Sequence, residues 1–275
     1  MKQKLIHSLK PFVPLIMLLV ILQLLGTLVM HTFVLKTIDQ TIDYWHIPIL
    51  LAVSLYDIGC IVSIWLVNHF LTKQATFWAF DRQQVSGFLK NLTGKRIFLI
   101  VLLIIYFSLP VMHHPNRLLE SVVVGGCTAI SEEFLFRGII FGYLLRIVKR
   151  GDHKHIWLAL TLSSLIFALS HLSNLQIQSL SSTLFQIIQA FGVGLLFATL
   201  YLKTGSLISS ILLHFLIDFA GIAAANGAPE PPVYNTSILM GVSISLVFIT
   251  IYLLFCRALL KDKHDLVLLN RPFAV

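Results

Sequence analysis

The sequence predicts an all-α membrane protein, a polytopic helical bundle of about eight transmembrane helices with both termini in the cytoplasm. Three observations lead to this fold class: the composition, the length of the apolar runs and the distribution of basic residues. The 275-residue chain is 57% hydrophobic and 12% charged, and its mean hydropathy is +0.88. A soluble domain carries roughly 25% charged residues, so this chain has too little charge to cover a soluble surface. Disorder is excluded as well, because a disordered chain combines low hydrophobicity with high charge.

Apolar runs recur along the whole chain, and a helix needs about 20 such residues to cross the hydrocarbon core of a bilayer. The first run is too long for the apolar part of a signal peptide and ends without a small-residue cleavage site, so we expect a retained anchor. Because the runs occupy most of the sequence, we expect residues 1–275 to form a single transmembrane domain. The runs are approximately 12–35, 47–71, 97–113, 120–147, 156–173, 181–202, 205–225 and 235–257.

The basic residues fall in alternate loops. Of the 20 Lys and Arg, Lys36 and Arg117 follow the first and third runs, and Arg137 lies inside the fourth. All the others precede the first run, follow the last, or lie at the loops after the second, fourth and sixth runs. Such a bias places these loops and both termini in the cytoplasm. The net charge of +8 is therefore explained by topology and contact with the lipid bilayer, and we expect no nucleic-acid partner.

Ionisable side chains within the spans indicate candidate functional residues, because inserting each one into the membrane costs roughly 2.5–3.5 kcal/mol on insertion scales. Asp57, in the second run, stands apart, and we interpret it as a polar residue of a helix-packing seam. The other ionisable residues in the interior of the spans gather in the fourth, fifth and seventh runs. They are Glu132, Glu133, Arg137, His171, His214 and Asp218.

A spacing of four residues places these side chains in pairs on common helix faces. Glu133 and Arg137 share a face and can form an ion pair. Glu132 is rotated by about 100° from Glu133 around the helix axis, so its carboxylate does not take part in this ion pair. Two further pairs have the same spacing: Phe167 with His171, and His214 with Asp218.

Carboxylates and imidazoles in a water-poor cavity can activate water. Glu132 is a candidate general base for a water held between it and His171, and an imidazolium can stabilise the oxyanion that forms. The sequence contains no GxSxG motif and no P-loop, so water attack on a peptide bond is the simplest interpretation. A zinc site is an open alternative, because two histidines and one or two carboxylates suffice for zinc with a bound water.

At these residues the sequence resembles a known family. Glu-Glu-x-x-x-Arg at 132–137, Phe-x-x-x-His at 167–171 and His-x-x-x-Asp at 214–218 occur in order on separate spans. This set is similar to the motifs of the CAAX-protease and bacteriocin-processing (CPBP, or abortive-infection) intramembrane proteases, which include the type II CAAX prenyl endopeptidase. The resemblance covers approximately residues 120–222, the expected protease core.

The resemblance implies roles for the residues that match. Glu132 corresponds to the glutamate that activates water, and His171 to the histidine that shares this water. His214 and Asp218 correspond to the pair on the oxyanion side. The prenyl endopeptidases usually have Asn at the last position, and an ionised Asp218 cannot donate a hydrogen bond to an oxyanion. It could orient His214 instead, or favour a metal. Residues expected to support the site are Glu133, Arg137 and Phe167.

The family resemblance favours a glutamate-type endopeptidase that requires no cofactor, with zinc as the alternative. The expected substrate is a membrane-embedded or membrane-associated peptide or protein, in bacterial peptide processing or bacteriocin self-immunity at the cytoplasmic membrane. Two other functions remain open at this point. One is a proton- or ion-coupled transporter, since buried carboxylates and histidines also form proton relays. The other is a non-catalytic membrane immunity or interaction protein on the protease fold.

Overall fold

The computed structural model describes residue 13 and the ranges 49–80, 93–147, 153–176, 178–225, 238–261 and 266–271. The anchor expected at 12–35 therefore lies, apart from Val13, outside the described residues. The regular elements of the described residues are all helices. They are α5 (Ile49–Val67), η3 (Asn68–Thr72), α7 (Gly94–His113), η4 (Pro115–Arg117), α8 (Leu118–Glu133), η5 (Phe134–Phe141), α9 (Gly142–Ile147), α10 (His153–Ser170), η6 (His171–Gln176), α11 (Leu180–Thr204), α12 (Leu207–Ala225), α13 (Ile238–Leu259) and η9 (Val267–Asn270).

The helices fall on the apolar runs, and each run from the second onward contains one. Four described helices are long and apolar enough to cross a membrane, and the all-α membrane bundle is thereby confirmed. The number of eight spans and the cytoplasmic placement of both termini stay predictions. The four helical segments are His153–Leu175, Leu180–Thr204, Leu207–Ala225 and Met240–Leu259.

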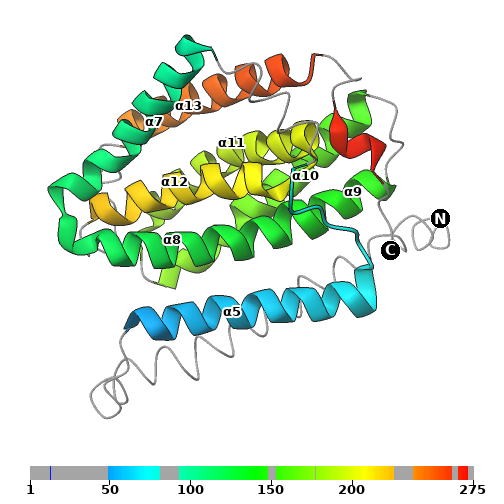
Figure 1. Cartoon of the computed structure of the whole chain (residues 1–275), viewed down its shortest axis with the longest axis horizontal. Helices are drawn as coiled ribbons and strands as arrows, with labels where there is room; N and C mark the ends of the chain where they lie inside the picture. Colours follow the sequence, from blue (N-terminus) through cyan, green and yellow to red (C-terminus); the bar gives the residue numbers. More distant parts are fainter. Residues whose placement is uncertain are drawn as a thin grey trace.

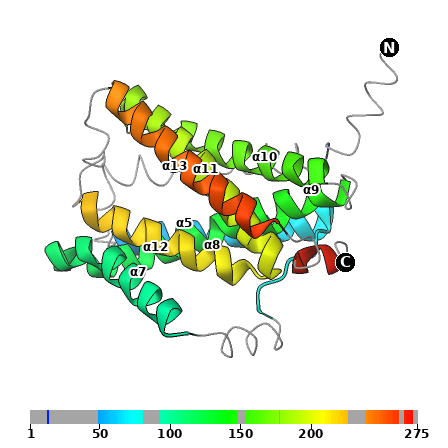
Figure 2. The ribbon, with the colours of Figure 1, turned by 90° about the horizontal axis from the view of Figure 1, so that it is seen from above.

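Two neighbouring helices, α8 and α12, form the centre of the bundle (Figure 1). α5 packs along α8, α7 packs against α12, and α11 packs against both α10 and α13 (Figures 1 and 2). Gly125 allows the close approach of α8 and α12, because a Cβ there would lie 3.2 Å from the backbone nitrogen of Phe219. Small residues at helix contacts are typical of membrane bundles, where tight packing replaces the hydrophobic driving force.

The fourth run does not form one regular α-helix. The apolar run predicts a continuous helical span over 120–147, whereas the structure contains a π-helical stretch, η5, between α8 and α9. Hydrophobic periodicity over a buried run does not distinguish a π-helix from an α-helix, so this feature was not predictable. π-Helical turns are rare and often occur at functional sites. Here η5 begins directly after Glu133 and contains Arg137, which is 1% exposed.

The start of α12 is fixed by the extended segment that follows η3. The backbone N–H of Leu207 donates to the carbonyl of Phe77 at 2.8 Å, and the Ser206 hydroxyl donates to the carbonyl of Trp78 at 2.6 Å. The N–H of Phe77 in turn donates to the hydroxyl of Tyr201 at 3.3 Å. The first N–H groups of a helix have no partner within the helix. These bonds therefore anchor the start of α12 and fix the position of its residues along the helix axis.

Candidate active site

A buried ion pair joins α8 to η5. The guanidinium of Arg137 donates to Glu133 Oε1 at 2.8 Å, and the two side chains are 1% and 0% exposed. The pairing predicted from the four-residue spacing is thus confirmed. The same guanidinium donates to the carbonyl of Gly194 at 3.3 Å and lies over the rings of Phe167 and Phe197, at 4.2 and 5.0 Å from their centroids. Arg137 therefore links three helices, because its partners come from α8, α10 and α11.

His214 of α12 lies against the same pair. Its Nδ1 is 2.9 Å from Glu133 Oε1, and its ring stacks on Phe197 with 4.8 Å between centroids. A carboxylate only accepts hydrogen bonds, so Nδ1 carries the proton that is donated to Glu133. The other ring nitrogen, Nε2, faces Asp218 Oδ2 at 3.4 Å and Glu132 Oε2 at 3.7 Å. Nε2 of this ring therefore has two carboxylates as neighbours.

His171 approaches from α10, at the point where this helix continues into η6. Its Nδ1 is 3.0 Å from the carbonyl oxygen of Phe167, which can only accept, so this nitrogen donates. In a neutral ring the other nitrogen then carries a lone pair. The ring of Phe167 meets that of His171 edge to face at 5.1 Å, which confirms that the two residues share a helix face. Phe167 also contacts Arg137, so it connects the two histidine-bearing regions through one buried ring.

All four side chains predicted to be catalytic line one cavity of about 280 Å³. Glu132 and Asp218 are partly exposed, with 30% and 25% of their side chains accessible, whereas His214 is 5% exposed. The supporting residues Glu133 and Arg137 do not line the cavity and lie behind it. The cavity is formed by Thr128, Glu132, Ser170, His171, Ser173, Asn174, Gln186, His214 and Asp218.

The sequence did not predict that a residue of α5 contacts the wall of this cavity. Asp57 is 6% exposed, and the hydroxyl of Thr128, which lines the cavity, donates to Asp57 Oδ2 at 3.5 Å. Asp57 is a polar residue of the α5–α8 seam, as interpreted, but this seam borders the cavity. The acidic residue within a predicted span was the only sequence signal for this position. The neighbours of Asp57 become apparent only from the packing of α5 on α8.

The histidines and carboxylates of the cavity are residue types that bind zinc. Within the part of the chain that the structure describes, no three His, Cys, Asp or Glu side chains are arranged to hold a metal ion. One nitrogen of each histidine is engaged, by Glu133 in His214 and by the carbonyl of Phe167 in His171. These bonds leave the other nitrogen of each ring able to act as a ligand, as is usual for metal-binding histidines, so zinc stays an untested alternative.

The part of the chain that contains the cavity residues is similar to known proteins. A family model described as "Type II CAAX prenyl endopeptidase Rce1-like" matches residues 114–220. The membrane-embedded CAAX protease MroQ of Staphylococcus aureus (strain USA300) is 36% identical over 88 residues, which cover 32% of this chain and 31% of that protein. The aligned part thus spans about a third of the curated relative, and no solved structure matches the chain. The three motifs all lie inside the matched region, so residues 114–220 are similar to the Rce1-like CAAX proteases of the CPBP family.

Proposed function

We propose that the chain is an intramembrane endopeptidase in which Glu132 and His171 activate a water that attacks a peptide bond. The observation that carries the proposal is the single cavity lined by Glu132, His171, His214 and Asp218. These side chains come from three separate helical segments and from the region that resembles CAAX proteases. A volume of about 280 Å³ admits a short stretch of peptide backbone together with a water.

The first step follows from the acceptors in the cavity. The carboxylate of Glu132 and the lone pair on the second nitrogen of His171 each accept one hydrogen of a water between them. The oxygen lone pair of this water then faces the substrate, and attack on the peptide carbonyl carbon forms a tetrahedral intermediate. Glu132 takes the proton that the water loses, which is the role of a general base.

The second step requires a donor for the oxyanion and a proton for the leaving amine. In its imidazolium form, His214 has an N–H on Nε2 that can donate to the oxyanion, because Nδ1 is already bonded to Glu133. Asp218 orients this ring through its 3.4 Å contact and is not itself the donor. The intermediate collapses when the C–N bond breaks, and Glu132 returns its proton to the leaving nitrogen. The products are a carboxylic acid and an amine, so one water is consumed.

The substrate on this proposal is a peptide or protein in or on the bilayer. The family resemblance favours bacterial peptide processing or bacteriocin self-immunity at the cytoplasmic membrane as its biological setting. No step of this proposed reaction involves a metal.

The proposal is tested by incubating the purified protein in detergent with a library of membrane-associated peptides and identifying the products by mass spectrometry. The wild type should cleave a subset of these peptides with and without a chelator, and the Glu132→Gln variant should cleave none of them. Cleavage that the chelator abolishes would replace the metal-free mechanism by a metal-dependent one. Undiminished cleavage by Glu132→Gln would overturn the assignment of the base. If the wild type cleaves no peptide while it is folded, the endopeptidase assignment fails.

A further inference from the structure

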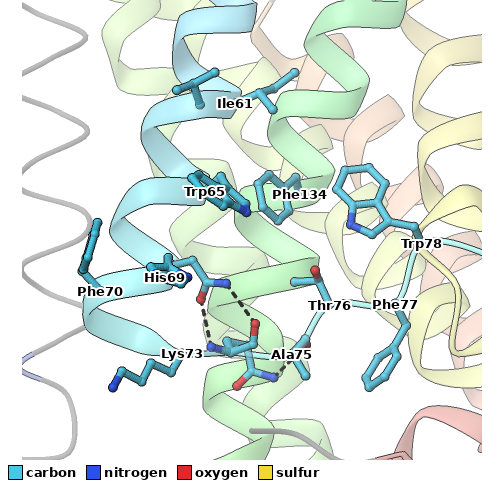
Figure 3. A pocket seen from close by; sticks show the side chains of 13 residues that line it. Ile61, Trp65, His69, Phe70, Lys73, Ala75, Thr76, Phe77, Trp78 and Phe134 are labelled. Carbon is cyan, nitrogen blue, oxygen red and sulfur yellow. Dashed lines mark hydrogen bonds between the residues drawn. The ribbon is translucent and has the colours of Figure 1, made fainter. Parts of the chain in front are cut away.

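A second and larger pocket lies away from the catalytic cavity. Its volume is about 1050 Å³, and it shares no lining residue with the cavity of Glu132. It is bounded by α5 and η3, by the extended segment 73–78 and by Phe134 of η5 (Figure 3). Small-molecule pockets typically measure about 300–1,000 Å³, so this pocket is large enough for a ligand of lipid size.

The walls of this pocket are mostly apolar and aromatic. Figure 3 shows the rings of Trp65, Phe134 and Trp78 across its upper part. Trp78 packs on Phe134 with 5.2 Å between centroids, while Trp65 and Phe70 are 54% and 69% exposed. The basic-residue pattern predicts that the loop after α5 is cytoplasmic, and on this prediction the pocket lies at the cytoplasmic interface. Tryptophan is enriched at that level of the bilayer, where one end of the ring is apolar and the other wet.

Lys73 supplies the charge at the polar end of the pocket. No Asp or Glu belongs to the lining, and no acid among the described residues pairs with the exposed Lys73 ammonium. Its backbone is held in the left-handed region, with φ of 47°, the only such non-glycine residue in the described ranges. The N–H of Lys73 donates to the carbonyl of Asn68 at 2.7 Å, and its own carbonyl accepts from Arg146 at 3.4 Å. Residues held in this conformation cluster at ligand sites, where the surrounding structure maintains the strain.

We propose that this pocket binds one anionic phospholipid of the cytoplasmic leaflet. Its phosphate lies at the Lys73 ammonium, and one acyl chain lies against Trp65, Phe134 and Trp78. A lysine that faces no acid among the described residues favours a headgroup with net negative charge over a zwitterionic one. Because Phe134 directly follows Glu132 and Glu133, a bound lipid packs against the helix that carries the proposed base. The bilayer would thereby support the geometry of the catalytic cavity.

The experiment measures retained lipid on the full-length protein. The protein is delipidated in detergent, incubated with equal amounts of dioleoylphosphatidylglycerol and dioleoylphosphatidylcholine, and analysed by native mass spectrometry. The wild type should retain one phosphatidylglycerol in preference to phosphatidylcholine. The Lys73→Arg variant should bind as the wild type does, and Lys73→Gln should lose about fivefold in retention. Val62→Trp, which fills the pocket, should reduce the retention of both lipids.

Lys73→Gly separates binding from folding, because glycine adopts the left-handed conformation without strain. This variant should unfold at the same or a higher temperature than the wild type and yet lose the lipid as Lys73→Gln does. Lys261→Gln, an exposed lysine at the end of α13 outside the pocket, is the matched control and should change nothing. Equal retention by Lys73→Gln and the wild type, or equal retention of the two lipids, would overturn the proposal. A dimer that retains no lipid would show that a second copy of the chain covers the pocket, which would also overturn it.

Discussion

Replacing Arg137 by leucine should destabilise the protein by about 3–5 kcal/mol, because it leaves the carboxylate of Glu133 buried without its cation. Both side chains are essentially inaccessible, and their contact measures 2.8 Å. The lost cation–π contacts with Phe167 and Phe197 act in the same direction. Leucine fills part of the space, so the uncompensated charge is the main contribution to the loss.

A double-mutant cycle isolates this contribution. Glu133→Leu alone leaves the guanidinium of Arg137 unpaired and removes the acceptor of His214 Nδ1, so it should cost a similar amount. The double variant removes both charges and leaves only His214 without its partner, at about 1–3 kcal/mol. We therefore expect the double variant to be at least about 2 kcal/mol more stable than the sum of the two single losses predicts.

The free energies of unfolding are measured by denaturant titration in detergent micelles. The control cycle uses Arg117 and Glu120, an ion pair at 2.5 Å whose side chains are 23% and 30% exposed. Exposed pairs of this kind contribute about 0–1 kcal/mol, so the control coupling should be small. If the coupling between Glu133 and Arg137 is no larger than that of the control pair, the reasoning about the buried network is refuted.

Two further predictions concern the packing around the cavity. Asp57→Leu should slow peptide cleavage about tenfold, because the Thr128 hydroxyl loses its acceptor. Asp57→Asn keeps an acceptor, so its cleavage rate should stay within about threefold of the wild-type rate. Equal rates for the two variants would contradict this role of Asp57. Gly194→Ala should cost about 1–3 kcal/mol of stability, measured by thermal unfolding, because the new Cβ would lie 3.1 Å from Phe167 and 3.3 Å from Arg137. The matched control, Gly221→Ala on α12, has no atom within 4 Å of the new Cβ and should not destabilise; an equal loss in both variants would show that helix packing at Gly194 is not the cause.

The local part of the site could be predicted from the sequence, because helix geometry relates residues four positions apart. The ion pair of Glu133 with Arg137 and the contact of Phe167 with His171 both follow from this spacing. The three motifs also identified which segments carry polar groups into one cavity. The resemblance to CAAX proteases was recognisable from these motifs, and the family model that matches residues 114–220 confirms this resemblance.

The remaining features depend on how distant helices pack, and no local pattern encodes them. The four-residue spacing predicts the pairing of Glu133 with Arg137, but not that Glu133 also accepts from His214, 81 residues away. Asp57 contacts the cavity-lining Thr128 only because α5 packs on α8. The left-handed backbone of Lys73 gave no signal either, since lysine does not favour this conformation.

The most direct test of the account is the single-turnover rate at which purified Glu132→Gln cleaves a peptide that the wild type cleaves. The comparison uses Glu120→Gln, an acid on the same helix outside the cavity, and requires equal unfolding temperatures for the three proteins. The account predicts that Glu132→Gln is slower by at least about 10²-fold, because glutamine cannot accept the proton of the attacking water, and that Glu120→Gln retains the wild-type rate. A rate for folded Glu132→Gln within a few-fold of the wild type would contradict the claim that Glu132 is the base.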